Sequence, residues 1–256
     1  MIRVRDLRVS YGGRVVAHVP ELDLPARTVV GIAGESGSGK SQTALALMGL
    51  SEYAGARVTG SIALDGEELT TKSPSEWRRI RGRRMGMIMQ SPRAALNPTM
   101  RLGAVFSRTL KLHGVGGGER ASRMRSALDE VVLSPDILQR YPHQVSGGQA
   151  QRFAIALVSA LRPDVIIADE PTSALDVTVQ AEVIEVLRGL RDKHGTALLF
   201  ISHDLAVISE LADSVTVMRQ GEVVESGPAG EVLRAPREPY TQALLAAVPV
   251  IGRSAS

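Results

Sequence analysis

The run Gly34-Glu35-Ser36-Gly37-Ser38-Gly39-Lys40-Ser41 has the spacing of a phosphate-binding loop, G-x-x-x-x-G-K-S. Glycines let the backbone N–H groups of such a loop turn inward onto phosphate oxygens, and a helix that begins at the loop directs its positive dipole end at them. We expect Lys40 to reach the β- and γ-phosphates of a nucleotide and Ser41 to bind Mg²⁺. The predicted nucleotide contacts continue to Gln42. The alternative is a plain Gly/Ser turn between a strand and a helix.

The segments that flank this run favour the phosphate loop over the plain turn. Residues 28–33 are TVVGIA, which predicts a buried strand, and residues 42–48 are QTALALM, which predicts a helix. A strand, the loop and then a helix is the context in which the motif binds phosphate.

Two acidic residues follow a second buried strand. Residues 165–168 are wholly apolar, and Asp169 and Glu170 come directly after them. In phosphoryl-transfer enzymes a carboxylate at such a strand end holds Mg²⁺ through water, and a neighbouring carboxylate can polarise the attacking water. We expect these roles for Asp169 and Glu170, with capping of the next element as the alternative.

Two further side chains are candidates for the same chemistry. His203 follows the predicted core strand 197–201, where it is a candidate contact for the γ-phosphate; the alternative is a capping role. Tyr11 lies at the tip of a predicted N-terminal hairpin. Its ring could stack on a nucleotide base, or it could pack at the edge of the sheet.

A second motif predicts another anion-binding helix end. Ser146-Gly147-Gly148-Gln149 precedes the predicted helix 150–157, and small residues at a helix N-terminus leave its N–H groups accessible to an anion. The chain therefore carries two predicted phosphate sites where one nucleotide needs one.

The remaining periodicity places these motifs in an α/β protein. Alternating or apolar runs predict further strands at residues 2–9, 15–19, 61–67, 85–89 and 215–224. Between residues 92 and 142 the spacing is helical, with a glycine-rich stretch at 114–118 that predicts a flexible connector. A long helix is expected at 177–193 and an amphipathic segment at 239–245. We interpret this as a helical lobe inserted into an α/β core.

The amino-acid composition limits the classes of protein to which the chain can belong. The 256 residues are 44% hydrophobic and 22% charged, which is ordinary for a globular protein. The longest apolar runs are far shorter than the roughly 20 residues that a membrane helix requires. There is no cysteine, so disulfides and cysteine-bound clusters are excluded. With no leader-like pattern at the N-terminus, we expect a cytoplasmic protein.

Net charge gives little reason to expect nucleic acid as a partner. The formal charge is only +3, and part of the basic excess lies in the run 78–84, RRIRGRR. Such a run is usually a solvated face, although it could bind nucleic acid or anionic lipid. Aromatic residues make up 3% of the chain, so no base-stacking platform is expected and nucleic acid is not a predicted partner.

The order of these motifs resembles the ATP-binding subunit of ABC transporters over nearly the whole chain. The matching motifs, in chain order, are the aromatic loop at Tyr11, Walker A at 34–41, the Q-loop at Gln90, the signature at 146–149, Walker B ending at Asp169-Glu170, the D-loop at Ser173-Ala174-Leu175-Asp176 and the switch histidine His203. Val145 stands where the family usually has leucine, and we expect little effect because both are apolar.

The resemblance implies a fold and a set of roles. The fold is α/β: a P-loop NTPase core, with a mixed sheet and an antiparallel β subdomain, plus an inserted α-helical subdomain. It implies a single domain, 1–256, with a RecA-like core at about 1–90 and 160–235, a helical subdomain at about 91–159 and a tail at 236–256. ATP and Mg²⁺ are the implied cofactors. Glu170, His203 and Gln90 are the implied catalytic residues, and Gln90 joins Ser41 and Asp169 as a metal ligand.

A closer resemblance is to the importer ATPases for oligopeptides, dipeptides and nickel. It rests on MQSPRAALNP at residues 89–98 and EPYTQALL at residues 238–245. Many peptide-type members carry a longer tail with cysteines that hold an iron–sulfur cluster. This chain, which stops at Ser256 without cysteine, is more similar in length to the short nickel type. Peptides, nickel and metal chelates all remain as predicted cargoes.

The family also implies partners. Two such subunits pair head to tail, so the Walker A loop of one holds ATP against the Ser146-Gly147-Gly148 end of the other. The further partners implied are two transmembrane permease subunits and an extracytoplasmic substrate-binding protein, with this chain peripheral on the cytoplasmic face of the cell membrane. The competing class, an ABC ATPase that acts on DNA or the ribosome, usually has two fused copies or long coiled coils, and neither appears in this sequence. A third class, a regulatory GTP switch, would need an Asn-Lys-x-Asp motif, which this sequence lacks.

Overall fold

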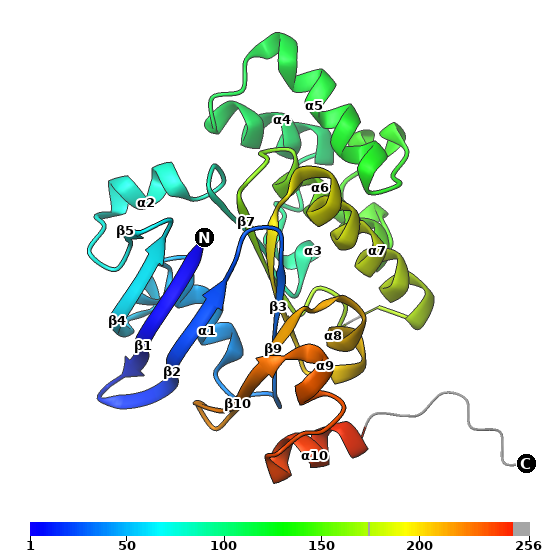
Figure 1. The fold of residues 1–256 in the computed structure, drawn as a ribbon. Helices are drawn as coiled ribbons and strands as arrows, with labels where there is room; N and C mark the ends of the chain where they lie inside the picture. The colour runs from blue at the N-terminus through cyan, green and yellow to red at the C-terminus, as the bar shows by residue number, and fades with distance from the viewer. Residues whose placement is uncertain (174, 248–256) are drawn as a thin grey trace, which may run out of the picture. The chain divides into compact units, whose positions relative to one another are not determined.

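The computed structural model describes residues 1–173 and 175–247, and its chain divides into two compact units. The helix-rich unit comprises residues 1, 24–28 and 71–199, and the strand-rich unit comprises residues 2–23, 29–70 and those from 200 onward. Figure 1 labels most of their helices and strands. Ala174 of the predicted D-loop and residues 248–256 of the predicted tail lie outside the described residues.

Seven strands form the sheet of the strand-rich unit, in the order β5-β4-β1-β2-β10-β9-β3. Their bounds are Ile2–Tyr11 (β1), Arg14–Leu24 (β2), Val29–Ala33 (β3), Arg57–Leu64 (β4), Glu67–Glu68 (β5), Ser214–Arg219 (β9) and Glu222–Pro228 (β10). β1 pairs antiparallel with β4 and β9 with β10, whereas β3 runs parallel to β9. The sheet is therefore mixed, as predicted.

The first strand shows how sequence alternation and burial agree, with one irregularity. Ile2 and Val4 are buried, and so are Leu7 and Val9, so the period of two shifts by one residue between the pairs. A β-bulge between Arg5 and Arg8 causes the shift because it adds a residue to one strand of the pair. The bulge keeps all four apolar side chains in the core.

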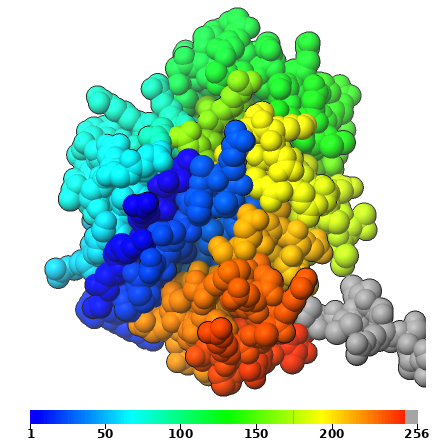
Figure 2. Space-filling model, viewed as in Figure 1, coloured from blue at the N-terminus to red at the C-terminus, as the bar shows by residue number. Residues whose placement is uncertain are grey.

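The helices of this unit follow its strands. They are α1 (Lys40–Leu47), the 3₁₀ turn η1 (Ser51–Ala54), α8 (Leu205–Leu211), α9 (Ala229–Val232) and α10 (Pro239–Ala246). α8 packs on β3 so closely that a Cβ at Gly31 would lie 2.6 Å from Ile208 Cγ2. In the space-filling view, the red atoms of α10 lie against the orange atoms of the chain that precedes it, which includes α9 (Figure 2).

The helix-rich unit contains most of the helices and the parallel pair β6–β7. Its elements are α2 (Pro74–Ile80), β6 (Met85–Ile88), α3 (Pro92–Ala95), α4 (Leu102–Leu112), α5 (Gly117–Glu130), η2 (Pro135–Gln139), η3 (Pro142–Gln144), α6 (Gly147–Ser159), β7 (Val165–Asp169) and α7 (Val177–His194). β8 (Ala197–Ser202) begins here beside β7, and its last three residues belong to the other unit. Phe106 of α4 and Phe153 of α6 meet edge to face, with ring centroids 5.6 Å apart, in the core of this unit.

The predicted α/β class is confirmed, since parallel and antiparallel pairs occur together with helices. The predicted flexible connector at 114–118 is partly wrong. Gly116 is the N-cap of α5, and Gly117 and Gly118 form its first turn. Glycine is tolerated there because the first N–H groups of a helix have no intrahelical partner. The predicted bounds of core, helical subdomain and tail stay a prediction.

The basic run at 78–84 is largely engaged within the helix-rich unit. α2 begins with a capping box formed by Ser73 and Glu76, so the run opens on the last turn of a helix. Arg81 lies over the Trp77 ring at 5.2 Å, and Arg84 forms an ion pair with Asp164. These contacts favour a structural role for the run within the protein.

No helix among residues 1–173 and 175–247 is both long and apolar enough to cross a bilayer.

Glu68 gives the strand-rich unit a pH-dependent contribution to stability. Burial alone would raise the pKa of Glu68, but hydrogen bonds from Ser61, Thr70 and the Ile62 N–H outweigh it and lower the pKa from 4.5 to about 2. A depressed carboxyl pKa stabilises the fold above the unfolded value, and this stabilisation is lost as the pH falls from about 4.5 toward 2.

We therefore expect Glu68→Gln to lower the free energy of unfolding at pH 7 by about 1–3 kcal/mol, the scale of hydrogen bonds to a charged group. The difference from the unchanged protein should shrink as the pH approaches 2. Urea unfolding at several pH values measures it, with Glu52→Gln on the exposed surface of η1 as the matched control. Equal stability of the Glu68 variant and the unchanged protein at every pH would refute this role.

Candidate active site

The predicted phosphate loop joins β3 to α1 in the strand-rich unit. α1 begins at Lys40 with Gly39 as its N-cap, and no side chain caps the helix. Lys40 is only 4% exposed, and its ammonium donates hydrogen bonds to the carbonyl oxygens of Gly34 at 2.7 Å and Glu35 at 2.8 Å. The loop thus curls around the lysine at the positive end of a helix, an arrangement that suits phosphate.

Close packing explains why glycine occupies the first position of the loop. Gly34 has φ +146°, and a Cβ there would lie 2.2 Å from the Met218 carbonyl oxygen on β9. The neighbouring turn also holds the loop, since the Gly221 N–H donates to the Ser38 carbonyl at 3.0 Å. The β9–β10 hairpin therefore supports the loop from outside.

Tyr11 and Gln42 lie together in the same unit. The Tyr11 hydroxyl donates to Gln42 Oε1 at 2.9 Å, which joins the end of β1 to α1 one residue after Ser41. The contact places the tyrosine close to the helix that begins at the loop. Stacking on a base and packing at the sheet edge both stay open.

His203 follows β8 and is exposed. The cap of the next helix, α8, is a different residue, because Asp204 Oδ1 accepts the Ala206 N–H at 2.8 Å. The capping alternative for His203 is therefore not favoured, and its predicted contact with the γ-phosphate stays a prediction.

Gln90 and Glu170 meet in the helix-rich unit, although 80 residues separate them. The Gln90 amide donates to Glu170 Oε2 at 2.9 Å and lies 3.4 Å from Ser173 Oγ. Asp169 is the buried last residue of β7, and Glu170 next to it has φ +45°. A left-handed backbone is uncommon for a non-glycine residue, and such positions cluster at active sites.

The Ser146–Gln149 motif forms the capped start of α6. Ser146 Oγ accepts the Gln149 N–H at 3.1 Å, and Gln149 Oε1 accepts the Ser146 N–H at 3.1 Å. α6 begins at Gly147, three residues earlier than the helix predicted from Ala150. Because the capping box uses the Gln149 N–H, the glycine N–H groups are the ones left to face an anion.

The glycines of this motif also make room for α7. A Cβ at Gly148 would lie 2.4 Å from Val179 Cγ1, whereas one at Gly147 would make an ordinary 3.7 Å contact with Leu175. Asp176 caps α7 by accepting the Val179 N–H at 3.1 Å. The start of α6 and the start of α7 are therefore in tight contact.

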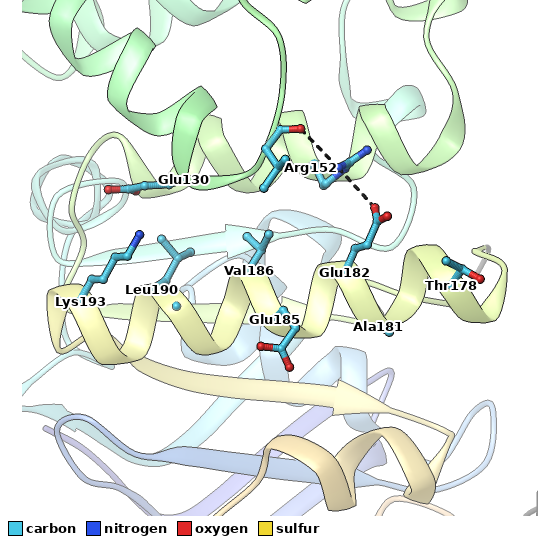
Figure 3. A pocket seen from close by; sticks show the side chains of 11 residues that line it. Glu130, Arg152, Thr178, Ala181, Glu182, Glu185, Val186, Leu190 and Lys193 are labelled. Atoms are coloured by element: carbon cyan, nitrogen blue, oxygen red, sulfur yellow. Dashed lines mark hydrogen bonds and ion pairs between the residues drawn. The ribbon is translucent and has the colours of Figure 1, made fainter.

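A cavity of about 600 Å³ lies elsewhere in the helix-rich unit (Figure 3). Arg152 of α6 spans it, pairing with Glu182 of α7 at 3.3 Å and donating to the Val132 carbonyl at 3.4 Å. Val186 and Leu190 give it an apolar wall. None of the predicted site residues lines this cavity, and its ion pair is a second link between α6 and α7.

Residues 1–173 and 175–247 contain no cluster of three or more His, Cys, Asp or Glu side chains that could hold a metal ion. Ser41, Asp169 and Gln90, the predicted ligands, supply one hydroxyl, one carboxylate and one amide oxygen.

One side chain at the phosphate loop, that of Tyr240, was not predicted from the sequence. The hydroxyl of Tyr240, on α10, accepts the Glu35 N–H at 3.1 Å. Periodicity could not reveal a contact between residues 205 positions apart. The available signal was the EPYTQALL stretch, which indicated a resemblance but no role.

Comparison with known proteins identifies the class of protein to which the chain belongs. Residues 18–173 match the ABC transporter family, and residues 224–256 match the C-terminal region of oligopeptide/dipeptide transporters. The dipeptide transport ATP-binding protein DppD of Escherichia coli (strain K12) is 46% identical over 86% of this chain and 68% of its own length. A Brucella melitensis biotype 1 protein with the provisional name peptide import ATP-binding protein BMEII0206 is 45% identical over 97% of this chain and 77% of its own.

A solved structure agrees with these relatives. The dimeric post-hydrolysis state of the ATP-binding cassette MJ0796, bound to ADP and Pi, has a TM-score of 0.78 and 26% identity, and the alignment covers 90% of this chain and 99% of the other. The fold and the loop define a P-loop ATPase that uses ATP and Mg²⁺. This chain belongs to the ABC transporter family of ATP-binding proteins.

Proposed function

We propose that the chain is the ATP-hydrolysing subunit of an ABC importer whose cargo is a peptide. The observation that carries this is the match of residues 224–256 to the oligopeptide/dipeptide transporter C-terminal region. The names of the relatives, which refer to peptide import and dipeptide transport, support the same cargo. Nickel or a metal chelate, predicted from the sequence, is the alternative.

The loop and its neighbours would bind the nucleotide. Residues 34–42 would hold the phosphates, with Lys40 exchanging its bonds to the Gly34 and Glu35 carbonyls for bonds to the β- and γ-phosphates. Tyr11 would contact the base. Mg²⁺, held by Ser41, Asp169 and Gln90, would neutralise charge that develops on the phosphates.

Glu170 would act as the general base toward the attacking water, and His203 would contact the γ-phosphate. The Gln90 hydrogen bond fixes the orientation of the Glu170 carboxylate, because one oxygen accepts the amide and the other is directed elsewhere. Ser173, whose hydroxyl donates to the Glu170 carbonyl at 3.2 Å, would steady the same turn.

Two copies or close relatives of the chain would pair head to tail. The capped start of α6, with the N–H groups of Gly147 and Gly148, would then face the nucleotide held by the partner's phosphate loop. The dimeric state of MJ0796 supports pairing, since its cassette has the same fold.

The segment after Gln90 would contact the permease subunits at the cytoplasmic face of the membrane. Met89, directly before Gln90, is an exposed apolar side chain, at 51% exposure, and α3 begins at Pro92, two residues after Gln90. Arg93 of α3 donates to the Val145 carbonyl, directly before the Ser146–Gln149 motif. A permease that displaces this segment would therefore also displace the start of α6. An extracytoplasmic binding protein would deliver the cargo.

Reconstitution tests the cargo. The complex of this chain with the proposed permeases and binding protein would be placed in proteoliposomes. ATP hydrolysis would be measured with a di- to pentapeptide mixture, with a Ni²⁺ chelate, and with neither. We expect peptide to raise hydrolysis several-fold over the basal rate. Stimulation by the nickel chelate and none by peptide would reverse the proposed cargo.

A further inference from the structure

The C-terminal helix contacts the phosphate loop through one hydroxyl group. Tyr240, the second residue of α10, accepts a hydrogen bond from the Glu35 N–H at 3.1 Å. Glu35 lies between Gly34 and the remaining loop residues. A helix near the end of the chain is therefore joined to the motif that binds ATP.

The bonded N–H belongs to the peptide unit whose carbonyl faces Lys40. The Gly34 carbonyl and the Glu35 N–H are two ends of one planar peptide, and in a trans peptide they point in opposite directions. The carbonyl end accepts the Lys40 ammonium at 2.7 Å, and the N–H end donates to Tyr240. This peptide is thus held on one side by the lysine and on the other by the tyrosine.

Contacts around the tyrosine fix where its hydroxyl lies. The Arg219 guanidinium stands over the ring, 4.9 Å from its centroid, a distance typical of a cation–π contact. Arg219 follows Met218, whose carbonyl lies against Gly34. The same end of β9 therefore supports both the first glycine of the loop and the ring that bonds to the next residue.

The chain that leads into α10 is fixed to the same hairpin. The Glu225 carboxylate on β10 accepts the N–H groups of Arg237 at 2.8 Å and Glu238 at 3.4 Å. The Gln242 side-chain amide donates to the Pro236 carbonyl at 3.0 Å and joins the first turn of α10 to the segment before it. Tyr240 is therefore held by bonds on both sides of it in the sequence.

From this arrangement we infer that Tyr240 is a positioning residue for ATP binding. Its hydroxyl fixes the orientation of the Gly34–Glu35 peptide, and through the Gly34 carbonyl it sets the resting position of the Lys40 ammonium. The inference rests on the role of Lys40 in the proposed function and is independent of the cargo. A C-terminal segment then tunes how the ATPase binds its nucleotide.

Removal of the hydroxyl alone tests the inference. Tyr240→Phe keeps the ring under Arg219 and loses only the bond to the Glu35 N–H. We expect the Kd for ATP of the full chain, measured by titration calorimetry, to rise about two- to tenfold, the scale of one hydrogen bond. The maximal rate of hydrolysis and the unfolding temperature without nucleotide should stay close to those of the unchanged protein.

Tyr53→Phe is the matched control, since it removes a hydroxyl from an exposed tyrosine of η1 in the same unit. An unchanged Kd in Tyr240→Phe would overturn the inference. So would a Kd change that is matched by a large fall in unfolding temperature, because the tyrosine would then be a packing residue only.

A second variant tests the pathway from β9. Arg219→Gln removes the cation over the ring and leaves the hydroxyl, so we expect a smaller rise in Kd. If Arg219 acts through the hydroxyl, the double variant Arg219→Gln/Tyr240→Phe binds ATP no more weakly than Tyr240→Phe alone. Additive losses would show that Arg219 acts on ATP by another route and would contradict the pathway.

Lys40→Ala, measured in parallel, separates this inference from the proposed function. Loss of ATP binding in Lys40→Ala with an unchanged Kd in Tyr240→Phe would remove the inference and leave the proposed role of the loop. Normal ATP binding in Lys40→Ala would remove both.

Discussion

Glu170→Gln is expected to lower ATP turnover by about two to four orders of magnitude while ATP still binds. The loss is the usual scale for removal of a general base. The substitution keeps the length of the side chain, and the new amide oxygen can still accept the Gln90 hydrogen bond, which spans 2.9 Å in the unchanged protein. Phosphate release measures turnover, and equilibrium titration measures binding.

Two comparisons make this result interpretable. Lys40→Ala should lose binding itself, because the loop no longer has the cation that its carbonyls enclose. Gln90→Ala keeps the Glu170 side chain and removes the amide hydrogen bond that orients it, so its turnover should fall less than that of Glu170→Gln. Turnover of Glu170→Gln at the level of the unchanged protein would mean that another group activates the water.

Gly148→Ala should lower turnover by up to about a hundredfold through a steric effect within the chain. The added Cβ would lie 2.4 Å from Val179 Cγ1, so the Val179 side chain or one of the helices α6 and α7 must shift. A displacement of about 1 Å in a catalytic group can cost that much in rate. Steady-state hydrolysis by the assembled transporter is the measurement.

Val179 offers a test of the cause. Val179→Ala removes the methyl group that a Cβ at Gly148 would strike, so the double variant Gly148→Ala/Val179→Ala should recover much of the lost turnover. Val179→Ala alone should hydrolyse ATP nearly as well as the unchanged protein. If the double variant remains as slow as Gly148→Ala, the glycine is needed for what it faces across the pair and not for its contact with α7.

Local patterns predicted the parts of the site that lie in single segments. The apolar run before Gly34 became β3, and the helix after it became α1. The apolar run before Asp169 became β7, and Ser146 became a helix cap. Each of these depends on neighbours a few residues away, which is the range over which periodicity and capping operate.

Contacts between distant segments could not be predicted in this way. No period or spacing links Gln90 with Glu170, or Tyr240 with Glu35. The family resemblance alone assigned Gln90 and Glu170 to one site, and it gave no role to Tyr240. α2 was also missed, since its basic last turn hid a capping box at Ser73 and Glu76. The left-handed backbone of Glu170 is set by its surroundings rather than by its residue type.

The turn between β9 and β10 bears on where a tag or reporter can be inserted. A hairpin tip is the usual choice because such tips tolerate insertions. Here the Gly221 carbonyl accepts the His18 N–H at 2.6 Å, and the Gly221 N–H bonds to the Ser38 carbonyl, so an inserted epitope would pull on the phosphate loop. The segment between α4 and α5 is a better location, since a Cβ at Gly116 would meet no atom within 4 Å. A fluorophore placed there can report on the helix-rich unit and leave the hairpin that supports ATP binding untouched.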